Sequence, residues 1–409
     1  MSKYNEFLGL CPIGAEVSFN NELKLNGFAL SEKFSGRLFF KDKAVSTKNV
    51  SKTETLFKSL IRANLWLRLA DRVGLVVTKF PCQNFDELFD GVLAVNWADF
   101  FSEDSKIVVE KVSSTKSKLA AERAIQSVTA KAIYSKLCST WHLNSLRETG
   151  LQFSVRLYLE NDFAYVVLDT SGEPLHKRGY RLSGGIAPIR ETAASLLLQL
   201  MRWKRKTPLH DPFCGSGTIP IEATLYAHNV PTGILRDFDF TKFALFEDKC
   251  FAQIYYEERA KALAKIQTGN LVRITGSDID DNAVSLSITN AEKACSLVEA
   301  EMRKIGRAEK LVRPEFVQAD IAEISAPYDE GLLLGNPLYG ERLGDETEAF
   351  ELYRKIALAI DEFPNWQKAF ITNKTEFPEI IREIKHRARF KEHPIKYGKL
   401  ETVLYEFVN

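Results

Sequence analysis

A polar motif, Gly335-Asn-Pro-Leu-Tyr-Gly-Glu-Arg-Leu343, follows an apolar run and contains residue types that can position a nucleobase. The exocyclic amine of a base is a poor nucleophile, because its lone pair is delocalised into the ring. The Asn336 side-chain oxygen and the Pro337 carbonyl can accept its two N–H bonds and hold the nitrogen in line with a methyl donor. Pro337 favours an extended Asn336, and Tyr339 can stack on an extruded base. For the tetrapeptide alone, a simple Asn-Pro turn is the better explanation.

A glycine loop in the stretch His210-Asp-Pro-Phe-Cys-Gly-Ser-Gly-Thr-Ile219 joins a predicted strand end to a predicted helix. In doubly wound sheets, a ligand binds at such a turn. Gly215 and Gly217 would let the backbone approach that ligand closely. There is no third glycine and no following Lys-Ser/Thr pair, which disfavours a dinucleotide fingerprint and a P-loop. A tight turn without a ligand remains the alternative.

Two acidic residues follow later strands of the same region. Asp278, in Thr275-Gly-Ser-Asp-Ile-Asp280, can accept hydrogen bonds from both hydroxyls of a ribose, with Ile279 against the adenine face. A helix N-cap is the competing role, and Asp280 suits the cap better, so both roles can be filled. Asp320 ends another strand and could accept a hydrogen bond from the adenine amino group, or it could cap a turn.

From about residue 186, strands alternate with helices, which predicts a parallel α/β sheet with covered faces. The predicted elements are helix 188–203, strand 209–211, helix 218–228, strand 272–277, helix 281–300, strand 314–318, strand 331–335, helix 348–361, strand 367–371 and a closing hairpin in 390–408. About sixty residues separate the glycine loop from Asp278, whereas a bare β-α-β unit needs about twenty. Residues 229–271 are therefore predicted to be an insertion. Its aromatic residues should pack in a core: Phe238, Phe240, Phe243, Phe246, Tyr255 and Tyr256.

The N-terminal half mixes strand and helix patterns without repeats. Its predicted elements are strand 7–11, helix 16–25, strand 36–40, helix 55–70, strand 73–78, helix 86–92, strand 107–111, helix 117–137 and a hairpin of strands 153–159 and 164–169.

The bulk composition excludes several classes of protein. The 55 Lys and Arg nearly balance the 54 Asp and Glu, so any nucleic-acid surface must be a local patch. The six cysteines are far apart without a C-x-x-C pair, which disfavours a zinc or redox motif and fits a reducing cytosol. The first residues lack a signal-peptide core, and no apolar run approaches the ~20 residues that span a bilayer. We expect a soluble, cytoplasmic protein with neither metal nor membrane partner.

The ordered motifs resemble the THUMP-domain class I RNA methyltransferases, a family with guanine-N2 methyltransferases of large-subunit ribosomal RNA. The resemblance covers nearly the whole chain and rests on residues 175–181, 187–193, 211–222, 276–280, 336–344 and 398–401. It implies a Rossmann-like class I methyltransferase sheet with S-adenosyl-L-methionine as cofactor. It also implies three parts: a ferredoxin-like part (1–45), a THUMP RNA-binding domain (46–160) and a methyltransferase domain (161–409).

The resemblance further implies roles for individual residues. The Gly-rich motif would contact the cofactor through Asp211, Phe213, Cys214, Gly215, Gly217 and Thr218. The ribose acid corresponds to Asp278 and the adenine contact to Asp320. The family's catalytic tetrapeptide, Asn-Pro-Pro-Tyr, corresponds to Asn336, Pro337 and Tyr339. Leu338 replaces the third-position proline and removes a restraint on φ; we expect activity, with rate or specificity open to change.

A basic run indicates where RNA would be held. Residues 105–136 contain seven Lys and Arg against two Glu. A solvated helix face would explain such a run alone, but beside a methyltransferase it favours phosphate contacts. Residues 382–399 have the same balance and either line the target pocket or form plain surface. The residues predicted to contact RNA are Lys116, Lys118, Arg123, Lys131, Lys177 and Arg178.

Several functions remain open at this level. Ribosomal RNA is the favoured substrate, with transfer RNA as a close variant. A DNA adenine-N6 methyltransferase could use the same Asn-Pro-x-Tyr motif, and a ribosome-assembly factor impaired by Leu338 would bind RNA without catalysis. The sequence does not define the oligomeric state.

Overall fold

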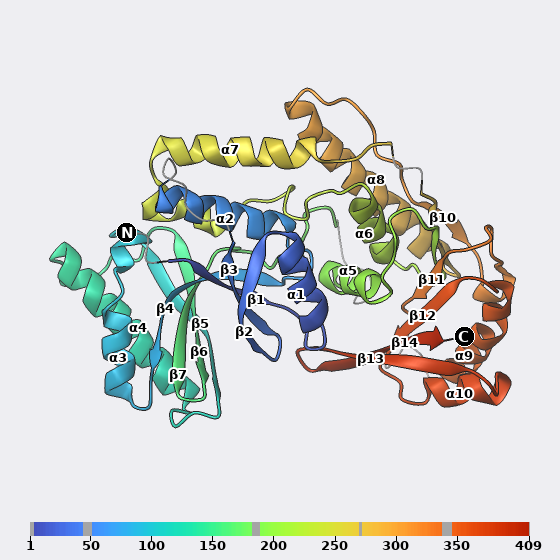
Figure 1. The fold of residues 1–409 in the computed structure, drawn as a ribbon, viewed down its shortest axis with the longest axis horizontal. Coiled ribbons are helices and arrows are strands. Elements are labelled where there is room, and N and C mark those ends of the chain that lie inside the picture. Colours follow the sequence, from blue (N-terminus) through green and yellow to red (C-terminus); the bar gives the residue numbers. More distant parts are fainter. Residues whose placement is uncertain (1–3, 44–50, 182–188, 270–271, 338–345, 409) are drawn as a thin grey trace. The chain divides into compact units, whose positions relative to one another are not determined.

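The computed structural model describes residues 4–43, 51–181, 189–269, 272–337 and 346–408. These residues form two compact units, each assembled from separate stretches of the chain (Figure 1). Unit 1 consists of the residues up to Leu10, Leu23–Leu175 and Asp237–Glu258. Unit 2 consists of Cys11–Glu22, His176–Arg236 and the residues from Arg259 onward.

Unit 1 is built on a seven-stranded sheet in the order β2-β3-β1-β4-β7-β6-β5. Its strands are β1 (Glu6–Leu10), β2 (Phe28–Phe34), β3 (Arg37–Asp42), β4 (Arg72–Pro81), β5 (Lys106–Thr115), β6 (Gln152–Glu160) and β7 (Phe163–Asp169). The helices of the N-terminal half are α1 (Glu16–Leu25), α2 (Lys52–Trp66), α3 (Phe85–Leu93), η1 (Trp97–Asp99) and α4 (Glu122–Trp141). Neighbouring strands are antiparallel except β5 and β6, which run parallel. The N-terminal half thus combines strands and helices, as its mixed pattern predicts.

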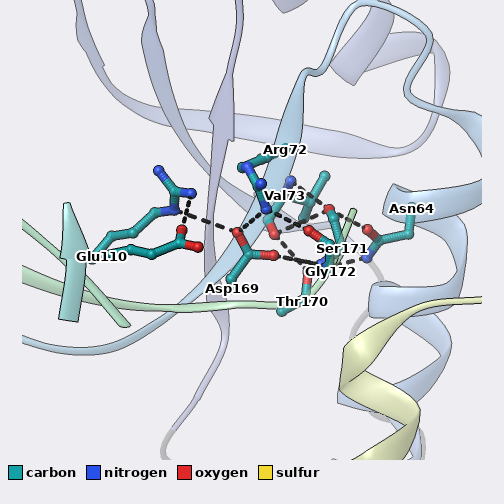
Figure 2. Close-up of polar contacts among 9 residues, drawn as sticks. Asn64, Arg72, Val73, Glu110, Asp169, Thr170, Ser171 and Gly172 are labelled. Carbon is teal, nitrogen blue, oxygen red and sulfur yellow. Dashed lines mark hydrogen bonds and ion pairs between the residues drawn. The ribbon is translucent and has the colours of Figure 1, made fainter. Parts of the chain in front are cut away.

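A buried polar cluster fixes the end of β7 in unit 1 (Figure 2). The Asp169 carboxylate is 3% exposed, and its Oδ2 lies 2.8 Å from Arg72 Nη1 and 3.4 Å from Arg156 Nε. Its Oδ1 accepts hydrogen bonds from the backbone N–H groups of Ser171 and Gly172. Burial raises the pKa of Asp169, and the two arginines and the two N–H groups counteract that rise. The Asp169 side chain of β7 thereby links β4, β6 and the turn at Ser171 and Gly172.

The predicted insertion 229–271 contributes to both units. It contains η2 (Asp239–Lys242), η3 (Ala244–Phe246) and α7 (Lys249–Ala264). In unit 1, the Phe57 ring of α2 contacts the rings of Phe240, Phe246 and Phe251, with centroids 5.5, 4.6 and 5.0 Å apart. The prediction that the aromatics pack is confirmed for Phe238, Phe240, Phe243 and Phe246, which are all buried, whereas Tyr256 is 56% exposed.

Unit 2 contains the predicted parallel α/β sheet, in the order β10-β9-β8-β11-β12-β14-β13. Its strands are β8 (Leu209–Asp211), β9 (Ile274–Asp278), β10 (Glu315–Gln318), β11 (Leu332–Gly335), β12 (Gln367–Thr372), β13 (Arg389–Tyr397) and β14 (Leu400–Val408). The first five run parallel, and the closing hairpin β13–β14 adds antiparallel strands beside β12. This confirms the expected Rossmann-like sheet.

Helices cover the sheet of unit 2 because its central strands are apolar. Leu332, Leu333 and Leu334 of β11 are fully buried. The helices are α5 (Glu191–Leu200), α6 (Thr218–Ala227), α8 (Asp281–Lys304), η4 (Ile321–Glu323), α9 (Glu346–Ala359), η6 (Ile360–Glu362) and α10 (Phe377–Ile384). Helix α6 contacts both α5 and α8, and α9 packs on α10 (Figure 1). Tyr353 of α9 and Phe377 of α10 join Phe370 of β12 in one apolar cluster.

The structure moves several expected boundaries. The division at residues 160/161 falls at the turn of the β6–β7 hairpin, so the compact unit continues to Leu175. The division at 45/46 does not interrupt the sheet, because β1 pairs with β4 as well as β3. The helix expected from residue 117 begins at Glu122. Lys116 has a left-handed φ of 49°, and the Lys118 N–H donates to Asp162 Oδ1, so the residues before Glu122 are not helical. The pattern missed β2, α7 and α10.

The described part of the chain lacks both a helix that could cross a membrane and a cluster of metal ligands. No helix there is long and apolar enough to cross a membrane. In the same residues, no three side chains of His, Cys, Asp or Glu come together as metal ligands would. The six cysteines all lie within described ranges and form no disulfide bond there.

Candidate active site

The loop from β8 to α6 is anchored on the neighbouring strand β9. Cys214 N donates to Ser277 O at 2.9 Å, and Gly215 N donates to Asp278 Oδ2 at 2.9 Å. Gly217 N donates back to Cys214 O at 2.7 Å and closes the turn. The φ angles of Gly215 and Gly217 are 52° and 80°. Both lie in the left-handed region that favours glycine.

The two glycines have different surroundings. A Cβ on Gly217 would lie 2.9 Å from Ser287 Cβ and 3.1 Å from Phe316 Cζ. A Cβ on Gly215 would have no described heavy atom within 4 Å. Gly217 is therefore needed for close packing against α8, whereas Gly215 borders open space, as expected of a residue that faces a ligand.

Asp211 and Phe213 connect this loop to the end of β11. The Asp211 carboxylate is 1% exposed and accepts a hydrogen bond from Phe213 N at 3.0 Å. Burial raises the pKa of Asp211 well above its usual range, and that hydrogen bond opposes the rise. A Cβ on Gly335 would meet the Phe213 ring at 2.9 Å. The Phe213 ring therefore lies directly against the residue that precedes Asn336.

His210 joins β8 to β9 beneath the loop. Its Nδ1 lies 2.8 Å from Thr275 Oγ1, and its Nε2 lies 3.1 Å from Ser277 Oγ. Burial lowers the pKa of His210 to about 4. The imidazole is therefore neutral at neutral pH and serves as a hydrogen-bonding link between the two strands.

The structure separates the two roles expected for the acids after β9. Asp280 caps α8, and its Oδ1 accepts from Asn282 N at 2.9 Å. Asp278 instead faces the loop, with Oδ2 on Gly215 N and Oδ1 on Asp280 N at 3.1 Å. Ile279 is 66% exposed. An acceptor and an exposed apolar surface thus adjoin the glycine loop.

Asp320 is already engaged by neighbouring groups. Its Oδ1 accepts from Ala322 N at 3.0 Å as the cap of η4, and its Oδ2 pairs with Lys355 of α9. Burial would raise the pKa of Asp320, but these two hydrogen bonds lower it overall. The cap that the sequence offered as the alternative is confirmed, and the adenine contact stays a prediction.

Asn336 follows β11 and carries an unusual atom. Its Oδ1 is buried and has no hydrogen-bond partner among the described residues. Buried polar atoms without partners are rare and need an explanation. Pro337 is buried beside it, whereas Leu338 and Tyr339 lie outside the described residues. An amide oxygen is thus held at the end of a central strand with no hydrogen-bond partner in the described part of the chain.

Arg178, in the segment before α5, was predicted to contact RNA but is buried in an ion pair. Arg178 is 2% exposed, and its Nη2 lies 3.6 Å from Oε2 of Glu222, which is fully buried on α6. Tyr180 Oη donates to Glu222 Oε1 at 3.2 Å, and Ser195 Oγ donates to Oε2 at 2.8 Å. Because a buried carboxylate must be paired, Arg178 is a structural ion-pair partner. This corrects its assignment to RNA contact.

Thr218, the first residue of α6, is buried, and its hydroxyl is engaged in a hydrogen bond. Its Oγ1 accepts from Arg181 Nη2 at 3.0 Å, and the same nitrogen lies 3.2 Å from Glu191 Oε1. Sequence reasoning gave Arg181 no role. Its position in the motif 175–181 was the only signal that could have drawn attention to it.

The other residues predicted to contact RNA are exposed. Lys116 and Lys118 lie between β5 and α4, and Arg123 and Lys131 lie on α4. Lys118 Nζ donates to Gln83 Oε1 at 2.7 Å. Lys177 is exposed in unit 2, where its carbonyl accepts from Arg236 Nη1 at 3.3 Å. Exposure is compatible with phosphate contact but does not test it.

The sheet order explains why distant motifs meet. Within this sheet, the first strand in the sequence is the central strand β8. The next two strands, β9 and β10, lie on one side of it, and β11 lies on the other side. Ligands of open α/β sheets bind beyond the carboxyl ends of the strands at this switch point. The glycine loop follows β8 and Asn336 follows β11, so both border it. This arrangement defines the class I fold of S-adenosylmethionine-dependent methyltransferases.

Comparison with known proteins identifies the family. The description "RMKL-like, methyltransferase domain" (UPF0020) matches residues 178–403, more than half of the chain. A THUMP domain matches residues 82–169. The chain therefore belongs to the UPF0020 family of RMKL-like methyltransferases, and the expected membership in the THUMP-domain class I RNA methyltransferases is confirmed.

Individual relatives agree with this assignment. YpsC of Bacillus subtilis, named as a candidate RNA methyltransferase, is 32% identical over 416 residues, which cover 100% of this chain and 96% of YpsC. The ribosomal RNA large subunit methyltransferase K/L of Shewanella baltica is 28% identical over 92% of this chain, which spans only 50% of that enzyme. The crystal structure of SMU.472 with S-adenosylhomocysteine (SAH) is 31% identical and superposes with a TM-score of 0.81 over 100% of this chain and 99% of its own.

Proposed function

We propose that this methyltransferase modifies the exocyclic amine of a base in structured RNA, and that the base is a guanine, methylated at N2, in large-subunit ribosomal RNA. The THUMP match and the name of the Shewanella relative support RNA as substrate. The observation that carries the chemistry is the buried Oδ1 of Asn336, which has no hydrogen-bond partner among the residues that the structure describes.

Asn336 would orient the target nitrogen. Leaving an acceptor buried without a partner costs about 1–3 kcal/mol, and an incoming N–H group would remove that cost. An amine bonded to Oδ1 is held in one orientation, so its lone pair can be aligned with the bond that breaks. The Pro337 carbonyl is the second acceptor in this proposal, with Tyr339 stacked on the base.

The donor site fits the residues around the glycine loop. The open space beside Gly215 admits a ligand, Asp278 offers carboxylate oxygens for ribose hydroxyls, and the exposed Ile279 offers an apolar surface for adenine. Asp211, Phe213, Cys214 and Gly217 shape the loop. When bound, S-adenosylmethionine supplies a methyl group on a positively charged sulfur.

RNA would be held by the exposed lysines and arginines. Lys116, Lys118, Arg123 and Lys131 belong to the basic run, and Lys177 precedes the methyltransferase helices. Phosphate contacts of this kind make binding strongly dependent on salt. Neutralising Lys116 and Lys118 together should therefore reduce both the affinity for RNA and its salt dependence.

Methyl transfer to purified substrates tests this proposal. The protein is incubated with labelled S-adenosylmethionine and with unmodified ribosomal RNA, transfer RNA or duplex DNA, and the modified nucleosides are identified by mass spectrometry. We expect N2-methylguanosine in ribosomal RNA. Transfer to DNA alone would overturn the choice of RNA, and transfer to transfer RNA alone would overturn the choice of ribosomal RNA. Binding of RNA but not of SAH would indicate an assembly factor.

The variant Asn336→Ala tests the catalytic step. It should lower kcat about 100-fold, the effect of losing alignment at the reacting atoms. Its affinity for SAH should stay within twofold, because the glycine loop is untouched. Asn336→Asp keeps an acceptor oxygen and should retain more activity than Asn336→Ala. An unchanged kcat in Asn336→Ala would refute the orienting role.

A further inference from the structure

The glycine loop has one anchor that does not come from β9. Asn290 lies in the middle of α8 and is 1% exposed. Its Nδ2 donates to Ser216 O at 3.0 Å, across 74 positions in the sequence. Ser216 stands between Gly215 and Gly217, where the backbone has the greatest freedom to rotate. This bond therefore restrains the part of the loop that the β9 contacts leave least defined.

Packing in the core does not explain why position 290 carries an asparagine. Its Oδ1 is buried without a hydrogen-bond partner among the described residues, and an acceptor in that state is destabilising. The same face of α8 otherwise presents the small buried residues Ser287, Ala291 and Ala294. An apolar side chain at position 290 would avoid the unpaired oxygen. It would also lack the donor to Ser216 O, which is the one thing the amide adds.

We infer that Asn290 is a positioning residue for the methyl donor, acting through the Ser216 carbonyl. The inference rests on the proposed donor site at Gly215. Without the bond, the peptides around Ser216 can rotate and the loop spends part of its time in other conformations. The apparent dissociation constant of a ligand rises in inverse proportion to the competent fraction. Asn336 follows a different strand, β11, so the chemical step in the bound complex is unaffected.

Two variants of Asn290 and one control on the same helix test this inference. Asn290→Leu removes both polar atoms at similar size, and Asn290→Asp keeps the shape but removes the N–H donor. Thr289→Ala is the control, because Thr289 is exposed and its hydroxyl, within the described residues, bonds to Ser285 O of its own helix. Calorimetry with SAH gives the dissociation constant, thermal unfolding gives the apparent Tm, and steady-state kinetics separate KM from kcat.

Both Asn290 variants should bind SAH about threefold to tenfold more weakly, the range for one lost hydrogen bond. KM for S-adenosylmethionine should rise by the same factor with kcat within twofold. In Asn290→Leu the apparent Tm should not fall, because the unpaired oxygen is gone, and a structural role could not produce that combination. Thr289→Ala should change neither quantity.

Two results would overturn the inference, and they differ from each other. Wild-type protein that fails to bind SAH would remove the donor site itself. Wild-type binding together with equal affinity in Asn290→Leu and Asn290→Asp would leave the donor site intact and remove only the role of Asn290.

Discussion

Replacing Gly215 with alanine should weaken cofactor binding at least tenfold and lower the stability of unit 2 by a few degrees in apparent Tm. The φ of Gly215 is 52°, and a side chain in the left-handed region costs about 1–2 kcal/mol. No steric penalty is added, because a Cβ there has no described heavy atom within 4 Å. For a unit of this size, each kcal/mol lowers the apparent Tm by about 2–4 °C. The apparent Tm should therefore fall by about 2–8 °C.

Binding is weakened separately, because the new methyl group would extend into the space assigned to the ligand. We expect the affinity for SAH to fall at least tenfold, about 1.4 kcal/mol. Gly306→Ala is the matched control: its φ is 79° and a Cβ there also has no described heavy atom within 4 Å, but it follows the end of α8. It should show the same loss of stability and unchanged binding.

Gly217→Ala provides the opposite case. Its φ is 80°, and the added Cβ would lie 2.9 Å from Ser287 Cβ. Overpacking adds about 1–3 kcal/mol to the backbone strain, so the apparent Tm should fall further than in Gly215→Ala. Isothermal titration with SAH and thermal unfolding of the three variants give both quantities. The reasoning is refuted if Gly215→Ala binds SAH within twofold of wild type.

Two further predictions concern buried charge and pH. Asp169→Asn should destabilise unit 1 by about 3–5 kcal/mol, because two arginines lose their buried partner. The control Glu110→Gln removes only the more exposed partner of Arg156 and should cost about 0–1 kcal/mol. Equal urea midpoints for the two variants would contradict this prediction. Burial lowers the pKa of His210 to about 4 in the folded protein. As the pH falls below 6.5, the unfolded chain therefore binds a proton on this histidine before the folded protein does. The free energy of unfolding of unit 2 should stay constant above pH 6.5 and decline by about 3 kcal/mol between pH 6.5 and 4. In urea titrations His210→Gln should lack this part of the decline, and an identical slope in the variant would exclude the assignment.

Sequence patterns predicted the parts of unit 2 that depend on neighbouring residues. Strand, glycine loop and helix follow one another within residues 209–227, and both the loop conformation and the cap at Asp280 are local consequences of residue type. The apolar run before Asn336 likewise predicted β11. Parallel order then follows from alternation of strands and helices.

The patterns failed where a partner is distant in the chain. Arg178 and Lys177 are adjacent basic residues, yet one is buried against Glu222 and the other is exposed. Charge alone cannot distinguish them, because the difference lies in a carboxylate on α6. Asn290 has no motif around it and is identified only by its bond to Ser216 O.

The sequence alone determined the class of sheet, the glycine loop and the order of the motifs, since each follows from residue types within one turn or one strand. The tertiary structure decided which surfaces those motifs share. It brought the ends of β8 and β11 together at the switch point, and it placed residues 237–258 in unit 1 although they follow the glycine loop. The reason is physical: local propensity sets φ and ψ, whereas burial and hydrogen bonding between distant residues are satisfied only once the chain is folded.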